Sequence, residues 1–271
     1  MHQMDLTEGV IWKKLILYAG PVVLSSLLQS AYSITDLIVA GWFIGKDGIS
    51  AINNASQVMM ILTQIIMGIT TGGNILMGQY FGSKDRSNRV KTNRTMFGFA
   101  LSAGALLSVL LFLLSRPILA ALRAPALEEA TAYLQVCSAG LIAIFGYNAL
   151  AAMLRSVGNS KQPFYCVAVT AGCNIALDCL FMGGFRWGVR GAALATVLAQ
   201  WASFVVCLVY VLRHRDLFGL VRRQISFHKD KMVQILKLGI PCAVQMTVVG
   251  LSWLAMTFLI NAYGVEASAA S

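Results

Sequence analysis

Apolar residues form seven long runs along the chain, separated by short polar stretches. The runs cover residues 15–43, 52–80, 95–114, 130–154, 163–185, 191–212 and 235–263. A helix of about 20 residues crosses roughly 30 Å of hydrocarbon at 1.5 Å per residue. Almost none of the runs carries the polar face that a helix needs on the surface of a soluble protein. The pattern therefore predicts an all-α polytopic membrane protein with seven spans.

Composition supports this prediction. Hydrophobic residues make up 58% of the 271 positions and charged residues only 12%, whereas soluble domains carry about 25% charged residues. The first run continues far beyond the core of a signal peptide, and no small-residue cleavage site follows it. We therefore expect the first run to be a retained span. The six cysteines lie inside apolar runs and match no metal-binding spacing, so they are interpreted as reduced packing residues.

The distribution of basic residues predicts the orientation in the membrane. Of the 21 Lys and Arg residues, sixteen precede the first run, follow an even-numbered run or open the seventh run. Five follow odd-numbered runs, namely Lys46, Arg116, Arg123, Arg186 and Arg190. Cytoplasmic loops carry the excess of Lys and Arg, so we expect a cytoplasmic N-terminus and insertion in the cytoplasmic membrane. A net charge of +10 is also typical of nucleic-acid binding. Because these charges flank spans, the predicted partner is the lipid bilayer and not a nucleic acid.

The longest connection, residues 213–234, separates the sixth and seventh runs. It mixes basic with apolar residues, so it is interpreted as an amphipathic segment on the inner membrane surface, with a solvated basic linker as the alternative. A weak repeat supports a boundary here, because Gly20-Pro21 opens the first run and Gly239-Ile240-Pro241 opens the seventh. Repeated halves are common in secondary transporters.

Two of the eleven acidic residues, Asp36 and Asp178, lie inside runs. A carboxylate in hydrocarbon costs about 2.5–3.5 kcal/mol or more, so such residues usually face a cavity or a partner. Each lies about seven residues before the outer end of its run, or about 10 Å deep. Thr196 lies about five residues inside the sixth run, at a similar level. We expect these side chains to share one depth in the outer half of the membrane.

Two more polar residues lie one helical turn from the carboxylates, Tyr32 before Asp36 and Asn174 before Asp178. The candidate cation site therefore comprises Tyr32, Asp36, Asn174, Asp178 and Thr196. Oxygen ligands of this kind suit Na⁺, with Asp36 and Asp178 as its anionic ligands. Two close carboxylates would equally form a proton-binding pair. The alternative is that each aspartate bonds separately to backbone or hydroxyl groups and only stabilises packing.

Other polar residues inside the runs are candidates for a substrate path, foremost Gln29, Asn148 and Gln200. Interhelical hydrogen bonding is the commoner role of such residues. The chain has no hydrolytic triad, no phosphate-binding Gly-Lys-Ser/Thr loop and no zinc spacing. We therefore expect no enzyme and no cofactor, and an ion gradient as the energy source of any transport.

Four stretches resemble one known family. They are Gly20-Pro21 with Tyr32, Asp36 and residues 37–41 (LIVAG), then 78–85 (GQYFGSKD), 154–163 (LRSVGNSKQP) and 188–196 (GVRGAALAT). Together they resemble the multidrug and toxic compound extrusion (MATE) family of secondary exporters. The resemblance implies two six-helix lobes around a central cleft with alternating access. It implies export of bulky, amphipathic, often cationic drugs in exchange for H⁺ or Na⁺.

The resemblance also gives the predicted residues their roles. It places a cation site of the N-terminal lobe on the same five residues, and it lets Pro21 bend the first helix when the occupancy of that site changes. The expected domains are a six-helix N-terminal lobe (1–212), the linker (213–234) and the first helix of an incomplete C-terminal lobe (235–271). Family members have about twelve spans, so we expect an N-terminal portion that lacks most of its C-terminal lobe. Residues 239–263 contain no acid, so the Na⁺ site that some members carry there is not expected.

The sequence leaves two alternative functions. A lipid-linked oligosaccharide flippase of the same superfamily would line its cleft with arginines and lysines that bind pyrophosphate. Almost no basic residue lies within a run, which disfavours this alternative. A seven-helix receptor would place its N-terminus outside, opposite to the predicted orientation.

Overall fold

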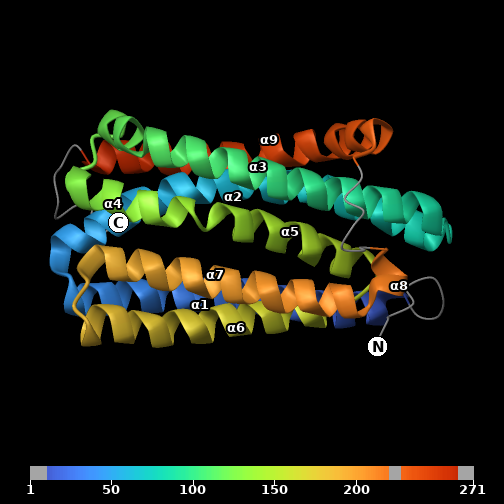
Figure 1. The fold of residues 1–271 in the computed structure, drawn as a ribbon, viewed down its shortest axis with the longest axis horizontal. Coiled ribbons are helices and arrows are strands. Elements are labelled where there is room, and N and C mark those ends of the chain that lie inside the picture. The colour runs from blue at the N-terminus through green and yellow to red at the C-terminus, as the bar shows by residue number, and fades with distance from the viewer. Residues whose placement is uncertain (1–10, 220–226, 262–271) are drawn as a thin grey trace.

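The computed structural model describes residues 11–219 and 227–261, and these residues are helical almost throughout, with no strand among them. The helices are α1 (Ile11–Phe43), α2 (Gly45–Gly82), α3 (Arg86–Ala121), α4 (Leu127–Ser138), α5 (Leu141–Ser156), α6 (Lys161–Asp178), the π-helical η1 (Cys179–Gly184), α7 (Gly188–Arg213), α8 (Arg215–Phe218) and α9 (Lys229–Asn261). The long helices run along the longest axis of the molecule (Figure 1). The predicted all-α membrane architecture is confirmed.

The fourth predicted span is broken in the structure. Six helical segments of the described residues are each long and apolar enough to cross a membrane, and there are up to seven when α4 and α5 count as one span. These two helices meet at an angle of 49° across Ala139 and Gly140. A Cβ on Gly140 would lie only 2.5 Å from Oε1 of Gln200. Glycine therefore permits both the bend and the close approach of α7, which apolar periodicity alone did not reveal.

The first residues after α7 dock onto α3. Arg89 Nη2, Asn93 Nδ2 and Arg94 Nε donate hydrogen bonds to the carbonyls of residues 217, 218 and 219, at 3.1, 2.8 and 2.9 Å. Phe218 is fully buried, so this part of the linker lies against protein. The rest of the predicted amphipathic segment, 220–226, lies outside the described residues. The proposed domain boundaries therefore stay predictions.

The start of α3 is capped by Asp85. Its carboxylate accepts a hydrogen bond from the backbone N–H of Asn88 at 3.0 Å and one from the Asn88 side chain at 2.7 Å. These bonds favour the ionised form and hold the pKa of Asp85 below its usual value. The N-cap satisfies donors that the first turn of a helix leaves free.

Helix α9 packs along α2 through small residues. A Cβ on Gly68 would lie 2.2 Å from Cα of Ala243, and a Cβ on Gly72 would lie 2.3 Å from N of Gly239. Such spacing of small residues lets helix backbones approach closely in membranes. The buried Lys231 adds a polar contact, because its Nζ donates to Tyr80 Oη at 2.8 Å. The seventh span is thereby fixed against the six-helix unit.

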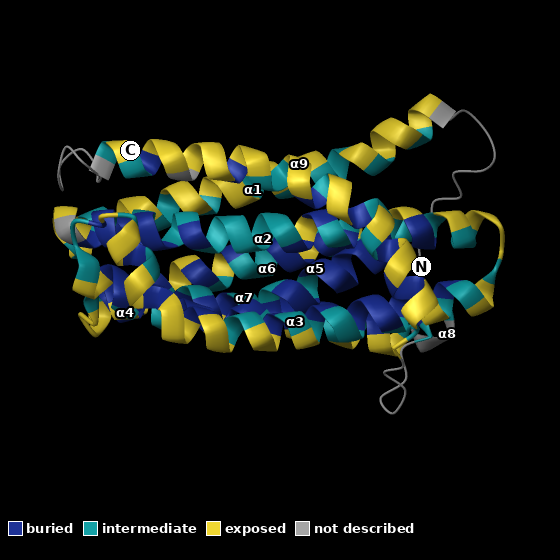
Figure 2. Ribbon diagram, turned by 90° about the horizontal axis from the view of Figure 1, so that it is seen from above, coloured by how far each residue is buried: buried dark blue, intermediate teal, exposed yellow. Residues whose placement is uncertain are grey.

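Large apolar side chains are exposed along α1 and α9, where Figure 2 shows much of the ribbon as exposed. Trp42 is 78% exposed and Leu259 is 63% exposed. Contiguous apolar exposure on this scale is typical of surfaces that meet lipid. The chain is a multi-pass membrane protein. The predicted cytoplasmic N-terminus concerns residues 1–10, which lie outside the described residues.

Candidate functional site

The two intramembrane carboxylates come together in the structure. Asp36 on α1 and Asp178 at the end of α6 interact with each other. Asp178 is fully buried. Both of its carboxyl oxygens, and Oδ1 of Asp36, have no hydrogen-bond partner among the described residues. A buried polar atom without a partner costs about 1–3 kcal/mol, and more when charged, so a proton or a cation would stabilise the pair.

The backbone around Asp178 is irregular. Helix α6 ends at Asp178 and continues as the π-helical η1. The rings of Phe181, Phe185 and Trp187 stack beside it, with centroids 5.2–6.1 Å apart. π-helical turns are rare, and those that occur within α-helices frequently lie at functional sites. Here the turn lies directly next to the buried carboxylate, and the aromatic stack fixes the chain that follows.

The other three predicted residues lie around the carboxylates. Tyr32 interacts electrostatically with Asp36. Asn174 is buried on the same helix as Asp178, and both atoms of its amide lack partners among the described residues. Thr196 on α7 donates to the carbonyl of its own helix, Ala192, at 3.0 Å. Their role in cation binding stays a prediction.

Sequence reasoning missed Tyr133, a buried residue of α4. Its hydroxyl contacts the side chains of Ser56 and Thr196, and it interacts electrostatically with Asp36. Tyr133 therefore links Thr196 to the carboxylate pair. The depth argument contained the signal, since Tyr133 lies near the outer start of the fourth run.

These side chains fit a small hard cation or protons. Two carboxylates and the Oδ1 atom of Asn174 are oxygen ligands of the kind that Na⁺ prefers. Nowhere in the described residues do three or more His, Cys, Asp or Glu side chains converge as a metal site. A bound Na⁺ would therefore depend on two carboxylates supplemented by neutral oxygens. Protonation of the carboxylates would satisfy the same buried atoms.

We expect Tyr133→Phe to lower the affinity of the site for the coupling cation while the protein stays folded. The change removes one hydroxyl that contacts Ser56 and Thr196, and losing such a hydrogen bond costs about 1 kcal/mol, or roughly fivefold in affinity. The measurement is the export rate as a function of coupling-cation concentration. Tyr165→Phe is the matched control, because Tyr165 is 57% exposed on α6. If both variants show the wild-type concentration dependence, Tyr133 has no part in the site.

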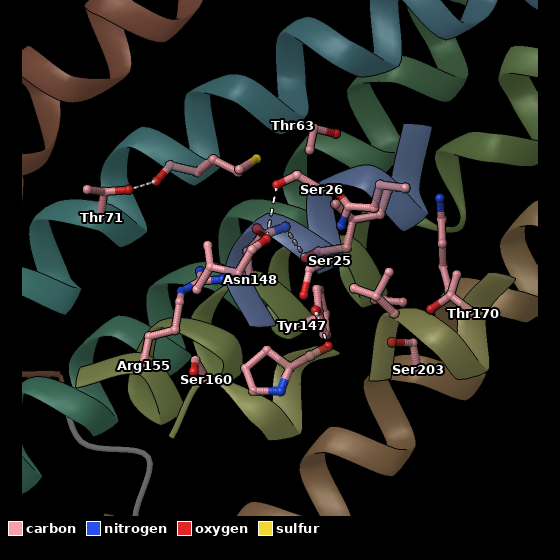
Figure 3. A pocket seen from close by; sticks show the side chains of 18 of the residues that line it. Ser25, Ser26, Thr63, Thr71, Tyr147, Asn148, Arg155, Ser160, Thr170 and Ser203 are labelled. Carbon is pink, nitrogen blue, oxygen red and sulfur yellow. Dashed lines mark hydrogen bonds between the residues drawn. The ribbon is translucent and has the colours of Figure 1, made fainter. Parts of the chain in front are cut away.

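A cavity of about 390 Å³ lies between α1, α2, α5, α6 and α7. Figure 3 shows hydroxyl and amide side chains from several of these helices around it. Gln29, Asn148 and Gln200 all line the cavity, as does Tyr32. Because Tyr32 also interacts with Asp36, it connects the cavity to the carboxylate pair. That the three amides bind substrate stays a prediction.

Pro21 lies inside the uninterrupted helix α1. Its ring removes the N–H that would bond to the carbonyl four residues earlier. Ser25 Oγ donates to the Pro21 carbonyl at 2.7 Å. Helix α1 therefore has a weak point about two turns before the cavity residue Gln29. A bend that depends on site occupancy stays a prediction.

Comparison with known proteins places the chain in a family. The MatE family model matches residues 21–180, more than half of the chain. The probable multidrug resistance protein YoeA of Bacillus subtilis is 30% identical over 269 residues, covering 96% of this chain and 58% of the relative. The multidrug export protein MepA of Staphylococcus aureus is 23% identical over 263 residues, covering 95% and 57%. The chain thus spans less than three fifths of the length of these relatives.

Solved structures share the fold. An outward-facing multidrug resistance MATE family transporter of the MOP superfamily gives a TM-score of 0.87 at 20% identity, covering 98% of this chain and 59% of its own. A MOP superfamily transporter from Pyrococcus furiosus, described by the reverse polarity of its binding pocket, gives 0.88 at 20% identity, covering 100% and 60%. Both similarities extend over the whole helical arrangement, including α9. The chain belongs to the MatE family, a family of transporters and not of enzymes.

Proposed function

We propose that this chain is the cation-coupling part of an antiporter that exports amphipathic, often cationic drugs across the cytoplasmic membrane in exchange for H⁺ or Na⁺. The observation that carries the proposal is the buried pair Asp36–Asp178, joined through Tyr32 to a polar cavity. The names of YoeA and MepA, a multidrug resistance protein and a multidrug export protein, support drugs as substrates.

The coupling follows from the electrostatics of the buried pair. Two ionised carboxylates in a low-dielectric site cost several kcal/mol when they are unpaired. A proton or Na⁺ neutralises them and lowers that cost. Tyr32 lies at the boundary of both sites, so occupancy of the carboxylates and occupancy of the cavity act on the same side chain. A ligand drives a conformational change only through its differential affinity for the two states.

Alternating access requires a second lobe facing this one. The chain spans 58% of YoeA, and α9 is the helix that begins this second lobe in the proposed arrangement. A complete antiporter would therefore contain further helices against the exposed apolar faces of α1 and α9. The proposed drug export therefore refers to the complete antiporter and not to this chain alone.

The flippase alternative is not favoured. Among the described residues that line the cavity, Arg155 is the one with a positive charge. A pyrophosphate carries more negative charge than a single arginine neutralises, so several basic residues would be required. The cavity instead offers hydroxyls and amides.

The test is ethidium export in bacterial cells that lack their own drug pumps and express the full-length protein that carries this chain. We expect efflux in energised cells, and we expect it to stop when the coupling gradient, either of protons or of Na⁺, is collapsed. Efflux that continues after both gradients are collapsed would contradict ion coupling. Ethidium efflux no faster than in cells that carry an empty vector would contradict drug export.

A further inference from the structure

The cavity is nearly neutral, with one exception. Nine of its lining residues carry hydroxyls, four carry amides and six are apolar. The remaining one is Arg155, and no Asp or Glu of the described residues lines the cavity. A cavity that selects cations by charge would expose a carboxylate to its contents. In this part of the protein, the fixed charge that a substrate meets is positive.

The guanidinium of Arg155 has no protein partner among the described residues, neither an ion pair nor a hydrogen bond. Its backbone carbonyl, in contrast, accepts a hydrogen bond from Tyr18 Oη at 3.1 Å. The residue is half-buried, and Figure 3 shows its side chain extending toward Asn148. Arginine carries five N–H donors in a planar fork that matches a carboxylate or phosphate.

Ser160 adds a second group at the same edge of the cavity (Figure 3). It is the N-cap of the 18-residue helix α6, yet its hydroxyl makes no capping hydrogen bond, and it is 4% exposed. The next turn is capped instead by Asn159 Oδ1, which accepts from Gln162 N at 3.2 Å. The Ser160 hydroxyl is thus free to face the cavity. The positive end of the helix dipole favours an anion there.

This edge lies far from the carboxylate pair. On α1, Tyr18 contacts Arg155 and Tyr32 interacts with Asp36. These two tyrosines are fourteen residues apart, which corresponds to about 21 Å along the helix. The cavity therefore has a positive group at one end and borders a negative cluster at the other. A substrate that carries both charges would complement both ends.

We propose that Arg155 and Ser160 form an anion-binding subsite that binds amphipathic substrates bearing a carboxylate or phosphate group, zwitterions included, more tightly than otherwise identical substrates that lack this group. This inference rests on the proposed function, because it requires the cavity to admit substrate. The guanidinium binds the two oxygens of the acid group, and the Ser160 hydroxyl donates to one of them. The hydroxyls and amides of the other walls hold the uncharged remainder of the molecule.

The experiment compares two dyes with the same xanthene core. Rhodamine 110 has a free carboxylate, whereas in rhodamine 123 that carboxylate is a methyl ester. Binding to the full chain in phosphatidylcholine nanodiscs is followed by fluorescence polarisation. We expect rhodamine 110 to bind at least about tenfold more tightly, since hydrogen bonds to charged groups are the strong ones.

The variants assign the preference to the subsite. We expect Arg155→Met to remove it while rhodamine 123 still binds, Arg155→Lys to keep part of it, and Ser160→Ala to reduce it. Lys161→Met is the matched control, because Lys161 is exposed and does not line the cavity. If Arg155→Met loses binding of both dyes, the subsite is tested by Arg155→Lys and Ser160→Ala instead. An unchanged preference for rhodamine 110 in those two variants overturns the subsite.

The outcomes separate the subsite from the proposed function. Equal, saturable binding of both dyes to the wild-type chain overturns the subsite alone. Absence of saturable binding for both dyes contradicts the substrate cavity and the subsite together. A preference that disappears when the nanodiscs contain phosphatidylglycerol, at an ionic strength that screens the surface charge of the bilayer, supports the subsite and identifies an anionic lipid headgroup as its ligand. A preference that persists there supports a soluble organic anion.

Discussion

Asp36→Asn and Asp178→Asn are each expected to reduce cation-driven drug export to the background rate, a loss of more than about tenfold. Asparagine has nearly the shape of aspartate but carries no negative charge, so the site loses the interaction that holds the coupling cation. A charge-assisted contact is worth about 1.5–3 kcal/mol, which corresponds to one to two orders of magnitude in affinity. The measurement is the initial rate of ethidium efflux at equal amounts of protein in the membrane.

Glu128→Gln is the matched control for these variants. Glu128 is also an acid, but it forms an exposed ion pair with Arg116 at 2.9 Å and lies away from the carboxylate pair. Exposed ion pairs contribute little to stability, so this variant should keep wild-type efflux. Wild-type efflux in both aspartate variants would show that the buried pair serves packing alone. That outcome would favour the structural alternative raised by the sequence.

Gly72→Leu is expected to release α9 from α2 and to destabilise the folded chain. A Cβ at Gly72 would lie 2.3 Å from N of Gly239 and 2.7 Å from the carbonyl oxygen of Ile235. Both atoms belong to the backbone, so the two helices must separate. Overpacking costs about 1–3 kcal/mol even where side chains can adjust, and the cost here should reach or exceed that range. Thermal unfolding in detergent, followed by size-exclusion fluorescence, measures the effect.

Gly20→Leu provides the comparison, because a Cβ on Gly20 of α1 meets no atom within 4 Å. We expect this variant to unfold at nearly the wild-type temperature. A cysteine pair placed across the α2–α9 contact should crosslink in the Gly20 variant and fail to crosslink in the Gly72 variant. Equal melting temperatures for both glycine variants would mean that the close helix contact contributes nothing to stability.

Much of the fold followed from apolar periodicity, because long runs without charge have few alternatives in a membrane protein. The break between α4 and α5 did not. Gly140 stands in an otherwise apolar run, and a glycine there is equally compatible with a straight helix. A Cβ at Gly140 would meet the side chain of Gln200 on α7, a residue 60 positions away in the sequence. Such tertiary contacts leave no local signal.

The carboxylate pair was predictable for a physical reason. Charged residues in hydrocarbon are rare, and helix rise converts position into depth, so Asp36 and Asp178 could be placed at one level before their contact was known. For Tyr133 the depth signal was weaker, because tyrosine is common in membrane helices and a charged residue is not. The docking of residues 217–219 on α3 was not predictable from the sequence either, because it uses backbone carbonyls, which every residue possesses.

The cavity lining was predicted only in part. Amides such as Gln29, Asn148 and Gln200 stand out in apolar runs, whereas serines and threonines do not. Their hydroxyls usually bond to the preceding turn, as Ser25 does to Pro21 and Thr63 to Met59. Sequence therefore could not tell which hydroxyls also face a cavity. In the sequence, Arg155 follows the fourth apolar run as one of the basic residues on the predicted cytoplasmic side, and only the packing of α5 brings it to the cavity wall.

The most direct test of the central claim is cation binding by the purified chain. Binding of ²²Na⁺, and proton release from the same sample in a pH-indicator assay, would be measured for wild type, Asp36→Asn, Asp178→Asn and the Glu128→Gln control. The account predicts saturable Na⁺ binding or titratable proton release that is present in wild type and the control and absent from both aspartate variants. Wild-type cation binding and proton release in Asp36→Asn and Asp178→Asn would contradict it.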